Sequence, residues 1–172
     1  SGFTLHYDRG MENHYFLISR GQALGLRIEV MQGKLPNDPR LADDWSPRRW
    51  RDNHPLGIEG LLSVDVSTTS LDEARHLFGE RLQWLEVSQR SLPAEGAQGL
   101  AFDAGDVVVE ALCSDHDGSA LAAHARDVRG ICGITFKVGS AQAAADYLRG
   151  RGYTLIGSPA TRFAIAPHAA LD

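Results

Sequence analysis

The sequence has 172 residues, of which 43% are hydrophobic and 23% are charged, a composition typical of a globular domain rather than a disordered chain. Its net charge of −5 excludes the basic footprint of a nucleic-acid-binding protein, and no apolar run is long enough to span a membrane. The two cysteines indicate no disulfide framework, so we expect a cytoplasmic protein. The chain begins at Ser1 without an initiating methionine, which suggests that it was cut from a larger protein.

The N-terminal part of the chain predicts strands without a helix before them. Residues 14–19 and 25–31 have strand-like patterns, and residues 25–31 resemble residues 106–112, with one glutamate at the same place in both. We therefore interpret residues 1–33 as the closing strands of a partial module. Residues 34–57 show neither a helix nor a strand period and predict a linker, in which Trp45 and Trp50 would pack on a module surface.

The rest of the chain contains a repeat. Residues 58–66 and 130–138 share a period-two pattern, and each predicts a strand with one apolar face. A helix follows each strand. Ser70 and Glu73 have the spacing of a capping box at the start of a helix predicted over residues 71–78. Residues 141–148 predict the second helix. Further strands are predicted at residues 84–87, 100–103, 107–113, 153–156 and 162–165, and a helical turn in the alanine-rich connection 114–129.

A unit of one strand, one helix and two or three strands resembles the vicinal oxygen chelate superfamily, which includes glyoxalases, bleomycin-resistance proteins and extradiol dioxygenases. The resemblance is greatest to the glyoxalase-like subgroup. It implies an α+β fold in which paired βαβββ modules form a curved, mixed sheet cup, with the partial module added at the N-terminus. The two-module domain would then span residues 58–172, as modules 58–113 and 130–172. The segments that carry the resemblance are 61–78 with 107–112, 133–148 with 152–153, 10–14 ahead of 26–31, and 54–57.

The resemblance also implies a place for a divalent metal ion, which this superfamily holds with residues of the first and last strands of its modules. The first-strand positions correspond to Leu61 and Gly133, neither of which can bind a metal. The last-strand positions correspond to Glu110 and Glu29, which are the candidate catalytic residues. A buried glutamate needs a cation, so one alternative for Glu110 is a pairing with a local arginine. The other is that Glu110 is exposed on the face of the sheet that is open to water.

A second candidate metal site lies near the N-terminus. His6 and His14 fall on strand-like segments close to Glu29, and the three could hold one divalent ion together with a ligand from outside the sequence. Arg27 lies two residues before Glu29 and offers it an ion pair instead. No histidine pair has the close spacing of a zinc helix.

Alternation along the two repeated strands predicts a polar, substrate-binding cup face. Asp65 and Lys137 occupy equivalent places in the two repeats, so an ion pair across the cup is one expectation. The alternative is that the polar residues face water on the open side of the sheet. The predicted substrate-binding residues are Leu61, Ser63, Asp65, Glu110, Gly133, Thr135 and Lys137.

Two functional hypotheses follow. In one, the protein is a metal-dependent lyase, isomerase or dioxygenase in which the ion polarises a small substrate and a glutamate moves a proton. In the other, the cup is a metal-free pocket for a small-molecule or drug-like ligand. A small-molecule partner is expected in both, a homodimer is left open, and Cys113 and Cys132 are interpreted as buried thiols.

Overall fold

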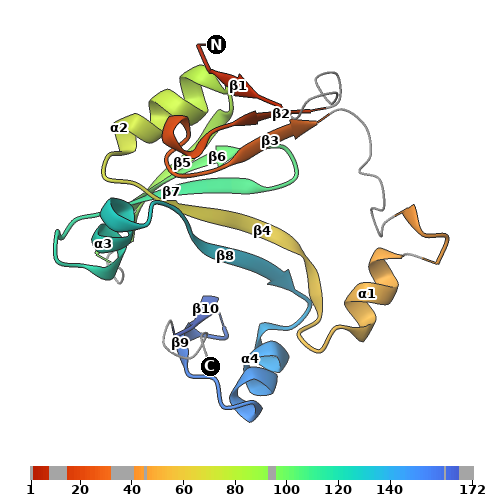
Figure 1. Ribbon diagram of the computed structural model, residues 1–172. Helices are drawn as coiled ribbons and strands as arrows, with labels where there is room; N and C mark the ends of the chain where they lie inside the picture. Colours follow the sequence, from red (N-terminus) through yellow and green to blue (C-terminus); the bar gives the residue numbers. More distant parts are fainter. Residues whose placement is uncertain are drawn as a thin grey trace. The chain divides into compact units, whose positions relative to one another are not determined.

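Figure 1 presents the protein as a computed structural model. The structure describes residues 2–7, 15–31, 41–44, 46–92, 96–160 and 162–166, without the side chains of residues 47, 49 and 50. His14, Trp45 and the side chain of Trp50 therefore lie outside the described residues. The chain divides into two compact units, one formed by Ser1–Lys34 with Leu61–Thr135 and the other by Leu35–Gly60 with Phe136–Asp172.

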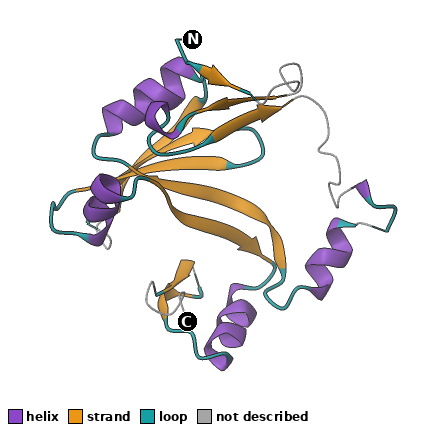
Figure 2. Cartoon of the chain, viewed as in Figure 1, coloured by secondary structure: helices purple, strands orange, loops and turns teal. Residues whose placement is uncertain are grey.

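The first unit contains a small antiparallel sheet built from the N-terminal residues. Its strands are β1 (Leu5–His6), β2 (Tyr15–Ile18) and β3 (Ile28–Met31), in that order. A short 3-10 helix, η1 (Arg20–Gln22), turns the chain between β2 and β3. Figure 2 shows these three strands side by side. The strands predicted at residues 14–19 and 25–31 are confirmed.

A five-stranded mixed sheet carries the first of the repeated modules. The strands β4 (Ile58–Ser67) and β7 (Val108–Ser114) run parallel, which requires a crossover connection between them. The other pairs, β7 with β6 (Ala97–Asp103) and β6 with β5 (Leu85–Leu92), are antiparallel. The sheet order is β5-β6-β7-β4-β8, so β8 (Gly130–Val138), the first strand of the second repeat, lies beside the first strand of the first repeat. The predicted βαβββ module is confirmed.

The crossover between β4 and β5 is helical and covers one face of the sheet. It consists of α2 (Leu71–Ala74) and a π-helical continuation, η3 (Arg75–Arg81). Ser70 caps it, since its Oγ accepts a hydrogen bond from the Glu73 N–H at 3.4 Å. We predicted a helix end before Gly79, but the helix continues past Gly79 to Arg81.

The hydrophobic core of the first unit contains side chains from α2 and η3, from the N-terminal sheet and from the five-stranded sheet. Phe78 stacks on Trp84 with ring centroids 5.3 Å apart and also contacts Phe102. Val66 of β4 and Ile18 of β2 belong to the same buried cluster. The alternate residues of β4, which include Val64 and Val66, therefore face the helix, and their neighbours face the opposite side of the sheet.

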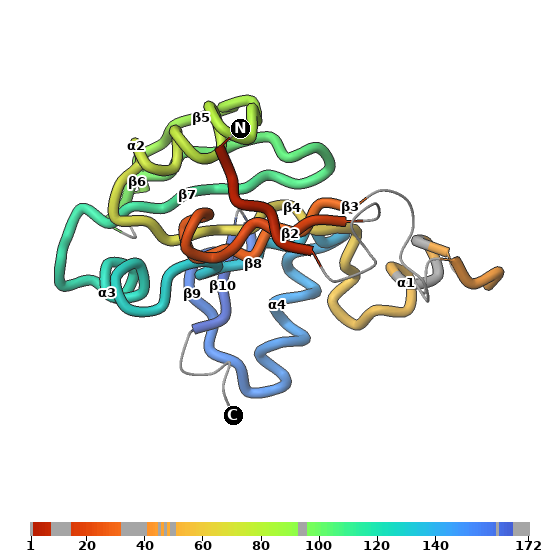
Figure 3. The backbone as a smooth tube through the Cα atoms, turned by 45° about the horizontal axis from the view of Figure 1, so that its top comes forward, coloured from red at the N-terminus to blue at the C-terminus, as the bar shows by residue number. Residues whose placement is uncertain are grey.

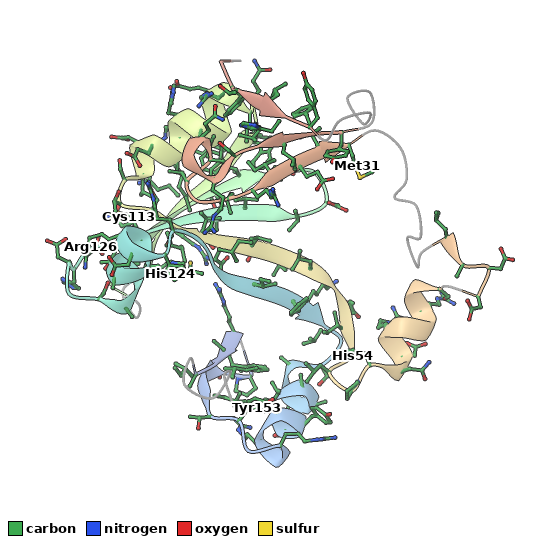
Figure 4. The ribbon with its side chains drawn as sticks, in the orientation of Figure 1. Met31, His54, Cys113, His124, Arg126 and Tyr153 are labelled. Atoms are coloured by element: carbon green, nitrogen blue, oxygen red, sulfur yellow. The ribbon has the colours of Figure 1, made fainter. Side chains whose placement is uncertain are left out.

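The helical turn predicted between residues 114 and 129 is confirmed as α3 (Ala120–Asp127), which packs against β7. The hydroxyl of Ser119 caps its first turn by accepting from the Ala122 N–H at 3.0 Å. His124 of this helix hydrogen-bonds through Nδ1 to the buried hydroxyl of Ser67 at 2.8 Å. Figure 4 shows His124 and Cys113 close to the junction of α3 and β7.

The described residues of the second unit include two helices and a two-stranded sheet. The helix α4 (Ala141–Gly150) and the antiparallel pair β9 (Leu155–Ser158) and β10 (Arg162–Ile165) confirm the predicted continuation of the second repeat. The helix α1 (Pro47–Asn53) was missed, because a helix of 7 residues is too short to show a helical period. Among the described residues, no helix has the length and hydrophobicity that crossing a membrane requires.

Candidate active site

Two carboxylates lie side by side on the face of the five-stranded sheet that points away from α2. Asp65 on β4 and Glu110 on β7 are direct neighbours in the parallel register. Their residues are only 5% and 3% exposed. Neighbouring parallel strands lie about 4.8 Å apart, so both side chains can reach the same small volume. Buried carboxylates are costly without partners, and the contacts of each one therefore define this site.

Glu110 is bound by Arg90 of β5. The guanidinium donates from Nε to Glu110 Oε1 at 2.6 Å, and its Nη2 donates to the second carboxylate oxygen, Oε2. This two-pronged geometry is the preferred mode of arginine toward a carboxylate. The side chain of Glu110 is 4% exposed and that of Arg90 is 43% exposed, so the pair bridges the buried face and the solvent.

A glycine makes the Arg90–Glu110 pair possible. Gly99 of β6 lies directly opposite Arg90 in the register, between Arg90 and the strand that carries Glu110. A methyl group added at Gly99 would overlap Glu110 Oε1 and would come within 3.3 Å of the carboxyl carbon. Because position 99 has no side chain, the glutamate can lean across β6 to reach the arginine.

A second glycine makes room for Asp65. A methyl group added at Gly133 of β8 would lie 2.9 Å from Asp65 Oδ2, closer than real side chains approach. Asp65 Oδ1 accepts a hydrogen bond from the Ser63 hydroxyl at 2.9 Å, two residues earlier on the same face of β4. Both carboxylates thus have a neighbouring glycine that leaves them space.

Cys132 lies beside this site, and the charge of Asp65 affects the pKa of its thiol. Its thiol donates to the backbone carbonyl of Asp65 at 3.4 Å. Burial of the thiol, with a smaller contribution from the negative charge of Asp65, raises the pKa of Cys132 to about 12. The residue as a whole is nevertheless exposed, and Cys113 is half-buried, so neither cysteine is fully buried as predicted, although the Cys132 thiol is largely covered.

The predicted substrate-binding residues do not all come together. The first unit contains Leu61, which is 41% exposed, and Thr135, which is half-buried, on the strands that also carry Asp65 and Gly133. Lys137 belongs to the second unit, where its Nζ lies 3.1 Å from Glu59 Oε2. The expected ion pair of Lys137 with Asp65 stays a prediction, because the two residues belong to different units.

The predicted N-terminal metal site is only partly described. His6, Leu17 and Glu29 are register partners on β1, β2 and β3, so His6 and Glu29 share a sheet face with one strand between them. Two strand spacings separate their backbones by about 9.6 Å. The suggested ion pair of Glu29 with Arg27 does not form among the described residues.

A divalent metal ion does not fit the donor set around Glu110. Leu61 and Gly133 occupy the positions that the family resemblance assigns to first-strand ligands, and neither has a donor atom in its side chain. Both oxygens of Glu110 are engaged by the positive charge of Arg90. In the described part of the chain, no group of three or more histidine, cysteine, aspartate or glutamate side chains is arranged to hold an ion.

The sequence analysis missed Arg90 and Gly99. The strand predicted at residues 84–87 ended before Arg90, whereas β5 extends to Leu92 and has a register irregularity between Glu86 and Ser88. The one available signal was the glutamate inside an apolar strand, which required a cation but did not identify it.

The topology and the site define the class of the fold. A βαβββ module whose first strand lies next to the first strand of a second repeat is the glyoxalase-like arrangement, and the chain has this fold. No protein-family model matches the chain, and no curated protein does.

Several solved structures share this fold with the chain at low sequence identity. Methylmalonyl-CoA epimerase from Mycobacterium tuberculosis is 20% identical over 66% of this chain and 82% of its own, with a TM-score of 0.57. A Streptomyces coelicolor methylmalonyl-CoA epimerase variant in complex with 2-nitronate-propionyl-CoA is 16% identical over 66% of this chain and 91% of its own, with a TM-score of 0.56. A hypothetical protein from Bacillus halodurans C-125 is 19% identical over 64% of this chain and 86% of its own, with a TM-score of 0.55.

Proposed function

We propose that this chain forms part of a small-molecule enzyme of the isomerase type, and that its site is the sheet face with Asp65 and Glu110. The observation that carries the proposal is the pair of buried carboxylates on neighbouring strands, each with a glycine that leaves it space. The methylmalonyl-CoA epimerases of the same fold support a reaction of this class. A 2-substituted acyl thioester is accordingly the first substrate class to test.

The chemistry proposed for this face is proton transfer at a carbon next to a carbonyl group. Carboxylates act as general bases and acids when they are held within hydrogen-bond reach of the reacting proton. We assign proton removal to Asp65, whose orientation is supported by the Ser63 hydroxyl. The guanidinium of Arg90, anchored on Glu110, places positive charge where negative charge develops on the substrate oxygen.

Deuterium uptake tests this proposal. The full chain is incubated in D2O with methylmalonyl-CoA and with other 2-substituted acyl-CoA thioesters. Mass spectrometry then follows the exchange of the hydrogen on the 2-carbon for deuterium. Asp65→Asn should slow the exchange by about 100-fold or more, because it removes the base but keeps the side-chain shape. The exposed Asp106→Asn is the matched control and should keep the rate.

Two results would contradict the isomerase proposal. One is the absence of exchange above the buffer rate with every thioester in the panel. The other is exchange that persists in Asp65→Asn and in Glu110→Gln at the rate of Asp106→Asn. Circular dichroism of each variant establishes that a lost rate does not reflect a lost fold.

A metal-free binding protein is the second candidate function. Leu61 and Gly133 at the positions expected for metal ligands favour it, because they leave this face without the donors that metal-dependent chemistry needs. A binder would retain a small molecule without turnover. Native mass spectrometry of the purified chain, followed by incubation of the retained compound in D2O, separates the two functions.

The metal ion and the cellular location stay proposals of their own. A divalent ion held by His6, His14 and Glu29 would give a stoichiometric signal in elemental analysis that Glu29→Gln removes. A cytoplasmic location is supported by the two free cysteines, Cys113 and Cys132.

A further inference from the structure

The first unit has a large cavity away from the two carboxylates. Its volume is about 920 Å³, near the upper end of the range for small-molecule sites. Residues of β1 and β2, the connection between β2 and β3, and residues at the start of β8 form its walls. The lining residues that matter most are Tyr7, Arg20, Arg27, Val128, Arg129 and Ile131.

The cavity is lined by positive charge without negative charge. Three arginines and His6 contribute to the described lining, which contains no aspartate or glutamate. Arg20 is held in place by a hydrogen bond from its Nε to the carbonyl of Gly25 at 2.9 Å. The guanidinium groups of Arg27 and Arg129 form no ion pair with any described residue. In a chain of net charge −5, such a gathering of arginines indicates a place for an anion.

The backbone holds the arginines at this place. Gly25, with φ +85°, lies against the residues that enter β8, and a methyl group added there would be 2.6 Å from the Gly130 nitrogen. The loop around Gly25 lies beside the beginning of β8 (Figure 3). Arg129 itself has φ +61°, a left-handed conformation that is uncommon for any residue other than glycine. This close packing brings Arg129 to the cavity that Arg20 and Arg27 also line.

The other walls of the cavity are apolar and partly open to solvent. Tyr7 is 53% exposed, Val128 58% and Ile131 52%. Exposed apolar side chains beside unpaired guanidinium groups suit a ligand that has both an anionic group and an apolar body. We propose that this cavity binds a small organic anion, with its carboxylate or phosphate on Arg27 and Arg129 and its apolar part against Val128 and Ile131.

This binding site does not depend on the function proposed for Asp65 and Glu110, because neither carboxylate lines the cavity. The two proposals therefore fail separately. Deuterium exchange reports on the carboxylates, whereas equilibrium binding of an unreactive anion reports on the cavity.

Isothermal titration calorimetry with the full chain tests the site. The probes are benzoate and phenyl phosphate, with inorganic phosphate and benzyl alcohol as partial ligands that each lack one feature. We expect one-to-one binding of at least one aromatic anion, and at least tenfold weaker binding of both partial ligands. The stronger of the two anions identifies carboxylate or phosphate as the preferred group.

Arginine variants connect the binding to this cavity. Arg27→Gln and Arg129→Gln should each weaken the binding of the aromatic anion by about tenfold, since each removes one charged hydrogen-bonding group. Arg48→Gln, an equal change of charge at an exposed arginine of α1, is the matched control and should leave the affinity unchanged. Two results would overturn the proposal. The first is that neither aromatic anion binds one-to-one or that a partial ligand binds as tightly, and the second is an equal loss of affinity in Arg48→Gln.

Discussion

Replacing Arg90 by glutamine should destabilise the first unit by leaving Glu110 charged and buried without its cation. Removing one partner of a fully buried ion pair costs about 3–5 kcal/mol. Arg90 is 43% exposed, so water screens the pair, and a smaller cost of about 2–3 kcal/mol is the expected change in the free energy of unfolding. The side chain of Glu110, at 4% exposure, has little access to water that would replace the guanidinium.

Urea denaturation in two backgrounds measures this coupling. In the wild-type chain, Arg90→Gln should lower the unfolding free energy by about 2–3 kcal/mol, as derived from the burial of the pair. In a Glu110→Gln background the same substitution should cost less than about 1 kcal/mol, because no buried charge is left behind. An equal cost of Arg90→Gln in both backgrounds would refute the reasoning, since the arginine would then act through contacts other than Glu110.

Three further predictions concern the space, the hydrogen bonding and the acidity around the site. In urea denaturation, Gly99→Ala should lower the free energy of unfolding by about 1–3 kcal/mol, because the added methyl group overlaps the Glu110 carboxylate. Gly60 has open space around it, so Gly60→Ala should change this free energy by less than about 0.5 kcal/mol. Equal effects of the two substitutions would contradict the prediction. Ser67→Ala should cost about 1–2 kcal/mol because it removes the buried 2.8 Å bond to His124, and an unchanged melting temperature would argue against that role. Because the pKa of Cys132 is raised to about 12, its alkylation by iodoacetamide, followed by peptide mass spectrometry, should accelerate about tenfold per unit between pH 8 and 10, and a plateau near pH 9 would disagree.

Much of the fold could be predicted because the signals for its strands and helices depend only on residues close together in the sequence. The period-two patterns of β4 and β8 and the serine cap of α2 all depend on neighbours within a few positions. The short helix α1 and the continuation of the second helix through Gly79 were missed. A helix of 7 residues shows no period, and a glycine after a helical stripe favours a helix end that the structure does not have at Gly79.

The candidate site was predicted only in part, for the same physical reason. Alternation along the strands placed Glu110 and Asp65 on one face, and an arginine partner was one of several alternatives for Glu110. Which arginine it is depends on the pairing of β5 with β6, where the register shifts and position 90 comes opposite Gly99. Likewise, Lys137 pairs with Glu59 because of strand pairing that the sequence does not encode locally.

The glycine at position 99 also limits the order in which this site can change during evolution. A larger residue there lowers stability as long as Glu110 and Arg90 are both present, because its methyl group would occupy the path of the glutamate. A lineage that moved toward metal binding would have to release Glu110 from Arg90 before new ligands at positions 61 and 133 became useful. Related chains should therefore show positions 90, 99 and 110 changing together.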